Sequence, residues 1–382
     1  MKRSLVLSLI FVAACASAPD KPQQAAPPGN QYTMEATTIP VGVIPAAVIH
    51  DAPRNKDLEL SIEYPTHGGP YPVIIFSPGY GGSRADYVGL SAFWASHGYV
   101  VIKISHADAG VVRETMREQE PERRDRRQRT ATQPQQPAPF RPDPAEMWQT
   151  QKPEEWRSRA ADVTSVIDSL PRLIEQYPEI KERVDANRIG VGGHSYGAFT
   201  AMLIGGVRPS NIPSLVDARV KAIEAMSPPG PSSTLGLTAD SFTNLRIPAL
   251  FLTGSRDFGA TESEDVAWRK QAYELSPAGD KWFVSIEGAS RFAFTGRIGE
   301  PIFAPAQPSP YPTNRPPIGG AYPQQQPMPS QRGAAPFRDL GLTNSVRTIS
   351  LAFWDAYLKN DNAGREYLNK LRGRGDVQVA AK

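Results

Sequence analysis

Gly193-His194-Ser195-Tyr196-Gly197 lies between an apolar run, residues 188–192, and a helical pattern over residues 198–203. A strand, a tight turn and a helix are therefore predicted here. A serine flanked by glycines in such a turn is typical of a nucleophile elbow. The glycines tolerate close contact, and the strained backbone lifts the serine hydroxyl clear of the sheet. The spacing also occurs by chance, so a structural glycine turn is the alternative to Ser195 as nucleophile.

Outside this turn, apolar runs alternate with helical patterns along the chain. Continuous apolar runs predict strands buried on both faces, as in a parallel sheet. Strands are expected at residues 38–50, 58–64, 73–76, 99–104, near 191, 220–225, 249–253 and 282–286. Helices are expected at residues 87–97, 159–177 and 344–358. The alternation predicts an α/β fold with a mainly parallel, doubly wound sheet covered by helices on both faces.

Two segments interrupt this alternation. Residues near 110–150 join a mixture of Arg and Glu to a run of Gln and Pro, and residues 299–336 are rich in Pro, Gln and Gly. Neither segment can bury a useful apolar face, so both are predicted to be flexible surface insertions. The arginines of residues 113–129 could contact anionic lipid head groups. The interleaved glutamates favour a solvated, self-neutralising loop instead.

The first 15 residues are predicted to be a signal peptide that ends in a lipidation site. Lys2 and Arg3 precede an apolar run, and Val12-Ala13-Ala14-Cys15 resembles the lipobox of bacterial lipoproteins. Cys15 is the only cysteine, so no disulfide can form within one chain. An ordinary signal peptide with an incidental cysteine is the alternative. Residues 16–35, rich in Pro, Gln and Ala, are expected to tether a domain at residues 36–375.

These features predict a protein of the bacterial cell envelope, anchored by lipid at Cys15 and facing the periplasm or the exterior. No later stretch is long and apolar enough to span a bilayer. The formal net charge of +3 over 382 residues favours neither nucleic acid nor an acidic molecule as a partner.

An activated serine needs a base within hydrogen-bond reach, an acid that orients the base, and donors where negative charge develops. Asp257 follows the strand predicted at residues 249–253 and is the candidate acid, with a helix-cap or loop carboxylate as the alternative. The glycine-rich loop at residues 77–83 follows an earlier strand. The backbone N–H groups of Tyr80 and Tyr196 are the candidate oxyanion donors, unless the loop is a merely structural turn.

The chain resembles the α/β-hydrolase branch that contains dienelactone-hydrolase-like esterases and platelet-activating-factor acetylhydrolases. The matching pieces occur in the family's order: residues 76–83, Ser105-His106-Ala107-Asp108, Arg159-Ala160-Ala161-Asp162-Val163, residues 193–197, residues 254–257 and residues 353–358. The resemblance implies an α/β-hydrolase fold and hydrolysis of carboxylic esters through an acyl-serine intermediate, with no metal or organic cofactor. Substrates of such relatives range from acyl phospholipids to small and polymeric esters, so a small ester or a lipid is the expected partner.

The sequence departs from the family pattern at the base. Relatives carry Gly-Ala-x-His after the last core strand, whereas this chain reads Gly288-Ala289-Ser290-Arg291. A guanidinium stays protonated and cannot accept the proton of Ser195. We expect Arg291 to form a charge-assisted pair with Asp257 instead. His194 should point away from the reacting face, and His106 is a poor substitute because intervening strands separate it from Ser195.

The sequence therefore predicts a membrane-anchored serine hydrolase that cleaves carboxylic esters, impaired because Arg291 replaces the histidine. Arg291 is either an individual change in an esterase lineage or the mark of a natural relative that lost the chemistry. In the second case the chain is a non-catalytic lipoprotein that binds a ligand or a partner on the same scaffold.

Overall fold

A computed structural model describes residues 32, 38–110, 151–259, 264–295 and 336–382, with only the backbone for 336–340. Its described part contains a nine-stranded sheet in the order β1-β2-β4-β3-β5-β6-β7-β8-β9. Neighbouring pairs from β4 to β8 are parallel, and the pairs β1-β2, β2-β4 and β8-β9 are antiparallel. The predicted α/β class and mainly parallel sheet are confirmed. The strands are β1 (Val41–Asp51), β2 (Lys56–Pro65), β3 (Tyr71–Ser77), β4 (Val100–Ser105), β5 (Val184–His194), β6 (Val220–Met226), β7 (Ala249–Arg256), β8 (Lys281–Ser290) and β9 (Val377–Ala381).

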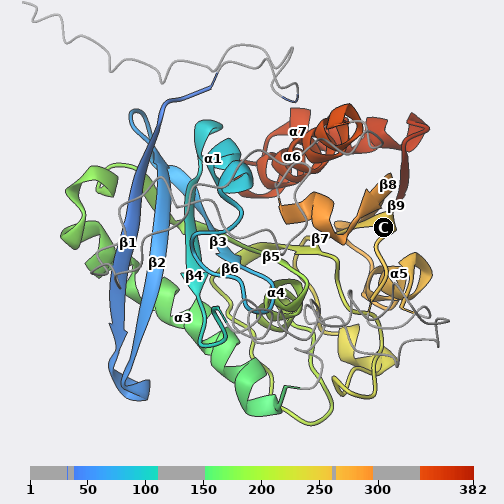
Figure 1. The fold of residues 1–382 in the computed structure, drawn as a ribbon, viewed down its shortest axis with the longest axis horizontal. Coiled ribbons are helices and arrows are strands. Elements are labelled where there is room, and N and C mark those ends of the chain that lie inside the picture. Colours follow the sequence, from blue (N-terminus) through green and yellow to red (C-terminus); the bar gives the residue numbers. More distant parts are fainter. Residues whose placement is uncertain (1–31, 33–37, 111–150, 260–263, 296–335) are drawn as a thin grey trace, which may run out of the picture.

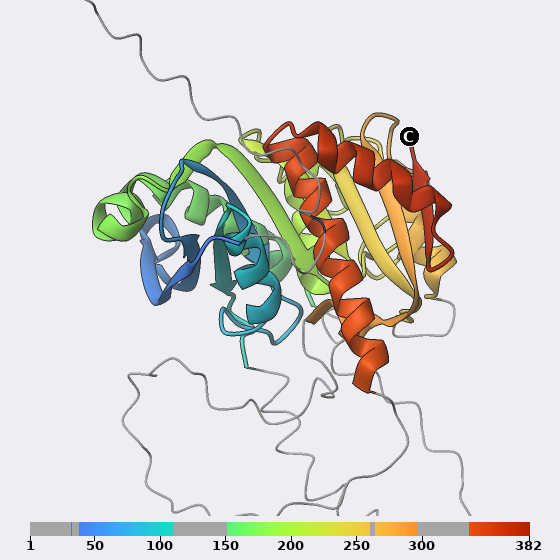
Figure 2. The same ribbon diagram turned by 90° about the horizontal axis from the view of Figure 1, so that it is seen from above.

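Helices cover both faces of the sheet (Figures 1 and 2). One face carries α1 (Val88–Ser96), α6 (Pro336–Leu358) and α7 (Asn362–Lys370), and the other carries α3 (Pro153–Gln176), α4 (Tyr196–Gly205) and α5 (Val266–Glu274). Short 3-10 helices occur at Ala52–Arg54, Pro178–Ile180, Ala239–Phe242, Arg291–Thr295 and Leu371–Gly373.

Two hydrophobic cores form because successive side chains of a strand point to opposite faces. In β3, Val73 and Ile75 pack with the helices α3 and α4, whereas Ile74 and Phe76 pack with α1 and α6. Strands buried on both faces are therefore apolar throughout, which is why their sequence signal was a continuous run.

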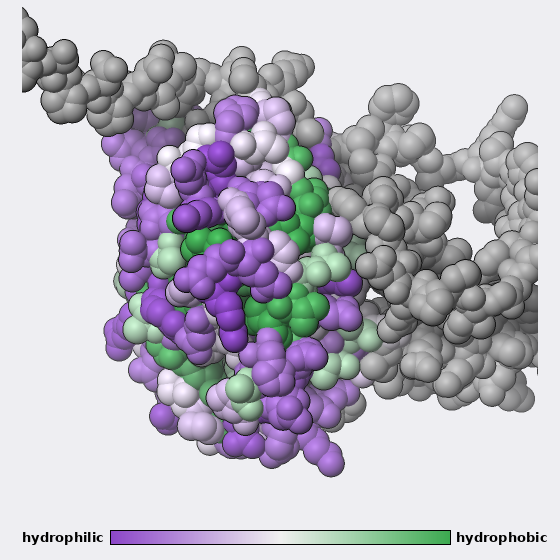
Figure 3. Space-filling view, turned by 90° about the vertical axis from the view of Figure 1, so that its left-hand side faces the viewer, coloured by the Kyte–Doolittle hydropathy of each residue, from purple (hydrophilic) through white to green (hydrophobic). Residues whose placement is uncertain are grey.

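Strand β1 forms one edge of the sheet and is interrupted in its middle. Pro45 lies within β1, and the pairing with β2 shifts register between Ile44 and Ala47. Proline has no N–H to donate, so an edge strand tolerates it, and the irregularity discourages pairing with another chain. The side of the molecule that carries this edge is mostly hydrophilic, with small apolar areas (Figure 3).

The predicted elements occur near their expected bounds, but the end of the chain contains more structure than expected. Helix α7 and strand β9 were not predicted, and β9 pairs with β8 beyond residue 375, where the predicted domain ends. Helix α5 was not predicted either. The predicted signal peptide with Cys15, and nearly all of the tether and the two insertions, lie outside the described residues. None of the helices described here has both the length and the apolar character that a membrane span requires.

Candidate active site

Ser195 lies at a sharp turn between β5 and α4. Its backbone has φ 57° and ψ −114°, a conformation that residues other than glycine rarely adopt. The turn is packed so closely that both flanking glycines are required. A Cβ on Gly193 would lie 2.2 Å from the carbonyl oxygen of Gly197, and a Cβ on Gly197 would lie 1.8 Å from that of Ser77. The predicted strand, turn and helix are therefore observed, with the serine at the apex.

Arg291 reaches Ser195 from the end of β8. Its Nη2 donates a hydrogen bond to Ser195 Oγ at 3.0 Å, and both residues are buried. A cation that cannot accept a proton thus contacts the hydroxyl that a catalytic base would have to deprotonate. That Arg291 occupies the place of the family's histidine stays a prediction from the resemblance.

Asp257 lies just after β7 and is fully buried. Thr253 Oγ1 donates a hydrogen bond to Asp257 Oδ2 at 2.8 Å, and Arg269 Nη2 lies 3.0 Å from Asp257 Oδ1. We expected Asp257 to pair with Arg291, but its cation comes from α5, and Arg291 is directed at Ser195. Arg269 gave no signal in the sequence because α5 itself was not predicted.

The two candidate oxyanion donors lie on elements that meet at the elbow. Tyr80 belongs to the loop after β3, Tyr196 is the first residue of α4, and their ring centroids lie 6.1 Å apart. Within this loop Gly79 N–H donates to Tyr87 Oη at 3.2 Å and Gly81 N–H donates to Asp108 Oδ2 at 2.8 Å. Hydrogen bonds thus fix the backbone on both sides of Tyr80. The role of Tyr80 and Tyr196 as oxyanion donors stays a prediction.

All five histidines of the chain lie in the described part, and none is hydrogen-bonded to Ser195. His194 points away from the hydroxyl: its Nδ1 bonds Tyr87 Oη at 2.9 Å and its ring packs against Phe294. Burial, with the charge of Arg269, lowers the pKa of His194 to about 3, so the ring is neutral. His106 bonds Ser77 and Asp162 instead, and no described histidine is therefore placed to act as the base.

The described residues contain no group of three or more His, Cys, Asp or Glu side chains that could hold a metal ion. The expectation that the reaction needs no metal or cofactor stays a prediction.

Comparisons with known proteins agree with the fold. Residues 51–211, which include Ser195 but neither Asp257 nor Arg291, match the family platelet-activating factor acetylhydrolase, isoform II. Over 234 residues the chain is 24% identical to the cutinase est2 of Thermobifida alba, covering 61% of this chain and 57% of that relative. The chain thus spans little more than half the length of this curated relative. The sheet and its helices have the architecture of the α/β-hydrolase fold, and residues 51–211 are similar to the platelet-activating factor acetylhydrolases.

Proposed function

We propose that the chain is a serine hydrolase of carboxylic esters whose turnover is strongly impaired by Arg291. One observation carries this proposal: Ser195 sits at a strained elbow and receives a hydrogen bond from Arg291 at 3.0 Å. The buried carboxylate of Asp257 at the end of β7 supports the same site. The similarity to a cutinase and to acetylhydrolases supports an ester as the substrate class.

In the proposed reaction the Ser195 oxygen bonds to the ester carbonyl carbon while its proton passes to a base. The leaving alcohol takes up that proton as the C–O bond breaks, and water then hydrolyses the acyl-serine to the acid. The N–H groups of Tyr80 and Tyr196 would bind the oxyanion between these steps. Arg291 opposes the first step because it cannot accept the proton and because its N–H already engages the attacking oxygen.

The decisive experiment supplies the base and follows turnover of short-chain aryl esters. Arg291→His is expected to raise kcat by about four to six orders of magnitude, since loss of one triad member costs roughly that much. Arg291→Gln removes the cation without adding a base, so it should gain little. Adding Ser195→Ala to Arg291→His should abolish the gain. An Arg291→His variant that stays inert on every ester tested would overturn the proposal.

A non-catalytic binding protein is the second candidate. The observation in its favour is the same contact, because Arg291 ties the nucleophile to a permanent cation. A fluorophosphonate probe separates the two functions: labelling of Arg291→His at Ser195 supports the hydrolase. Absence of labelling in both chains, together with an inert Arg291→His, supports the binding protein.

We further propose that the substrate is an acyl lipid or a small ester at the bacterial cell envelope, where lipid on Cys15 would hold the chain facing the periplasm or the exterior. The motif at residues 12–15 supports this location. Expression in a bacterium followed by membrane fractionation tests the anchor. Cys15→Ser should move the protein from the membrane fraction into the soluble fraction, and an unchanged distribution would contradict lipidation at Cys15.

A further inference from the structure

Near the elbow, Ser77, His106 and Asp162 are joined by hydrogen bonds in that order. Ser77 Oγ lies 2.9 Å from His106 Nε2, and His106 Nδ1 lies 2.8 Å from Asp162 Oδ2. All three residues are buried, and Ser77 is fully so. Arg159 Nη2 also donates to Ser77 Oγ at 3.2 Å. This hydroxyl cannot meet a substrate, so the arrangement is not a second catalytic site.

The hydrogen bond donated by Arg159 determines which atom is the donor in each of the next hydrogen bonds. Because Ser77 Oγ accepts a hydrogen bond from Arg159, its own proton is available for His106 Nε2. His106 Nδ1 then carries the ring proton and donates it to Asp162. Burial, with the positive charge of Arg159, lowers the pKa of His106 to about 4, which agrees with a neutral ring.

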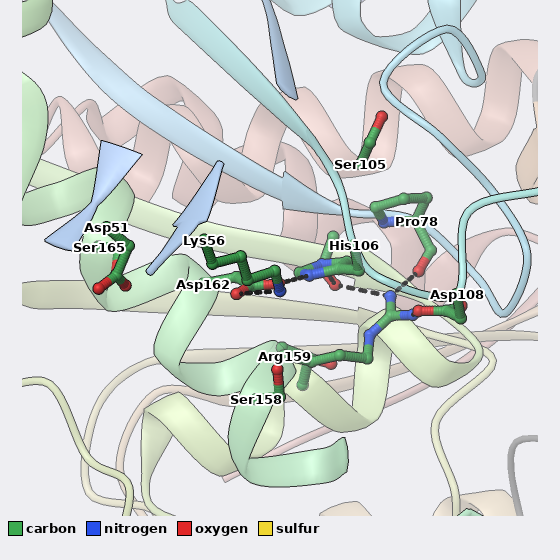
Figure 4. A network of polar contacts seen from close by, with 12 residues as sticks. Asp51, Lys56, Pro78, Ser105, His106, Asp108, Ser158, Arg159, Asp162 and Ser165 are labelled. Atoms are coloured by element: carbon green, nitrogen blue, oxygen red, sulfur yellow. Dashed lines mark hydrogen bonds and ion pairs between the residues drawn. The ribbon is translucent and has the colours of Figure 1, made fainter. Parts of the chain in front are cut away.

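Arg159, from α3, is the centre of this network (Figure 4). Its guanidinium is buried, donates to both carboxylate oxygens of Asp108 at 2.7 and 2.9 Å, and also donates to the carbonyl oxygen of Pro78. Asp108 in turn accepts the N–H of Gly81 at 2.8 Å. Arg159 and Asp108 therefore hold the backbone two residues before and one residue after Tyr80.

The same guanidinium reaches the other side of the site. Its carbon lies 4.2 Å from the ring centroid of Tyr196, a stacking distance at which a cation is attracted to the ring face. One buried side chain thus contacts the loop that carries Tyr80 and the residue that begins α4. These two elements come from distant parts of the chain, and the N–H groups of their tyrosines must point at one oxygen atom.

The far end of the network is anchored in the hairpin of β1 and β2. Asp162 is fully buried and accepts hydrogen bonds from Lys56 Nζ at 2.7 and 2.8 Å and from Arg54 Nη1 at 2.7 Å. The carboxylate of Asp162 therefore accepts several hydrogen bonds, and these fix the part of α3 that carries Arg159.

We propose that Arg159, braced by Asp108, is the positioning residue that aligns the N–H groups of Tyr80 and Tyr196 as one oxyanion site. The inference rests on the proposed ester hydrolysis. Displacement of reacting groups by about 1 Å can cost roughly 100-fold in rate, and loss of one oxyanion donor costs about 100- to 1,000-fold in kcat. Substrate binding away from the oxyanion does not depend on Arg159, so KM should change little.

The kinetic test uses the Arg291→His background. Arg159→Met should lower kcat about 100-fold or more and leave KM within about threefold. Leu173→Ala is the matched control, because Leu173 is a fully buried residue of the same helix and lies in the apolar core. It should lower the melting temperature while kcat stays within about threefold. A kcat loss in Arg159→Met no larger than in Leu173→Ala would overturn the positioning role.

A second readout does not depend on activity. Hydrogen exchange of a peptide that spans residues 78–83 should accelerate at least tenfold in Arg159→Met of the chain as it stands, and not in Leu173→Ala. Unchanged exchange in Arg159→Met overturns the inference even where esters are hydrolysed. Faster exchange together with an inert Arg291→His variant would show that Arg159 fixes the loop and would contradict the proposed hydrolysis, so the two failures are distinguishable.

Discussion

Arg269 and Asp257 form a buried ion pair in which Arg269 Nη2 lies 3.0 Å from Asp257 Oδ1. The same guanidinium donates to the backbone carbonyl oxygens of Ser227, Pro228 and Asp257 itself. One side chain of α5 therefore fixes the segments that follow β6 and β7. The candidate acid is held by its own cation, independently of the residue at position 291.

Arg269→Met should destabilise the fold by about 3–5 kcal/mol, because it leaves a buried carboxylate without its cation. Urea unfolding at neutral pH measures the loss. Arg157→Met is the control, since Arg157 pairs with Glu154 on the surface and should change the free energy of unfolding by less than about 1 kcal/mol. Equal losses of stability in the two variants would contradict a larger contribution from the buried Arg269 pair than from the exposed Arg157 pair.

Acid should weaken the fold through the neutral, buried His106. Its pKa of about 4 lies below its ordinary value of 6.5, so the unfolded chain binds more protons between these values. The contribution of His106 to the free energy of unfolding, up to about 3 kcal/mol, is complete above pH 6.5 and is lost as the pH falls to about 4. Asp162 extends the loss: burial opposes its ionisation, but hydrogen bonding and charge from His106 and Lys56 outweigh burial and lower its pKa to about 2.

The measurement is the free energy of unfolding from pH 7 to pH 4. His106→Gln should flatten its decline, although the variant is less stable at neutral pH. The exposed His50, exchanged for Gln in the same way, should leave the slope unchanged. If His106→Gln keeps the full slope, other groups cause the acid sensitivity.

Glu224 should act in the opposite direction. It is fully buried in β6 and accepts a hydrogen bond from Ser350 Oγ at 2.7 Å, and burial raises its pKa to about 8. The folded chain therefore binds more protons than the unfolded chain between pH 4.5 and 8, so stability falls as the pH rises through this range. Glu224→Gln, which is always neutral, should match the parent near pH 5 and exceed it by about 3–5 kcal/mol above pH 8. Parallel pH profiles for the two chains would contradict a neutral Glu224.

Much of the fold followed from the sequence because its signals are local. The glycine spacing around Ser195 indicates a turn made by adjacent residues. A continuous apolar run such as residues 73–76 indicates a strand that is buried on both faces. Position 291, in contrast, was singled out only by the resemblance, because relatives carry Gly-Ala-x-His where this chain has Gly288-Ala289-Ser290-Arg291. The short strand β9 and helix α5 carried too little pattern to be distinguished from loops.

The missed contacts join residues that only the folded sheet brings together. Ser77 and His106 are 29 positions apart, and His106 and Asp162 are 56 apart. Ser77 ends β3, His106 directly follows β4 and Asp162 belongs to α3. The sequence contained both motifs, but it did not show that their side chains form one hydrogen-bonded string. Likewise, the partner of Asp257 depends on how α5 packs, which single-residue patterns do not reveal.

The positive φ at Ser195 lets the cost of the catalytic turn be measured as a loss of folding stability. With φ 57° and ψ −114°, any side chain at position 195 stores conformational energy that glycine does not. Ser195→Gly should therefore have a free energy of unfolding in urea about 1–3 kcal/mol larger than that of Ser195→Ala, although both lack the nucleophile. Identical unfolding curves would mean that the elbow is relaxed. Because neither variant has the nucleophile, the comparison measures the cost of the elbow as a difference in the free energy of unfolding alone.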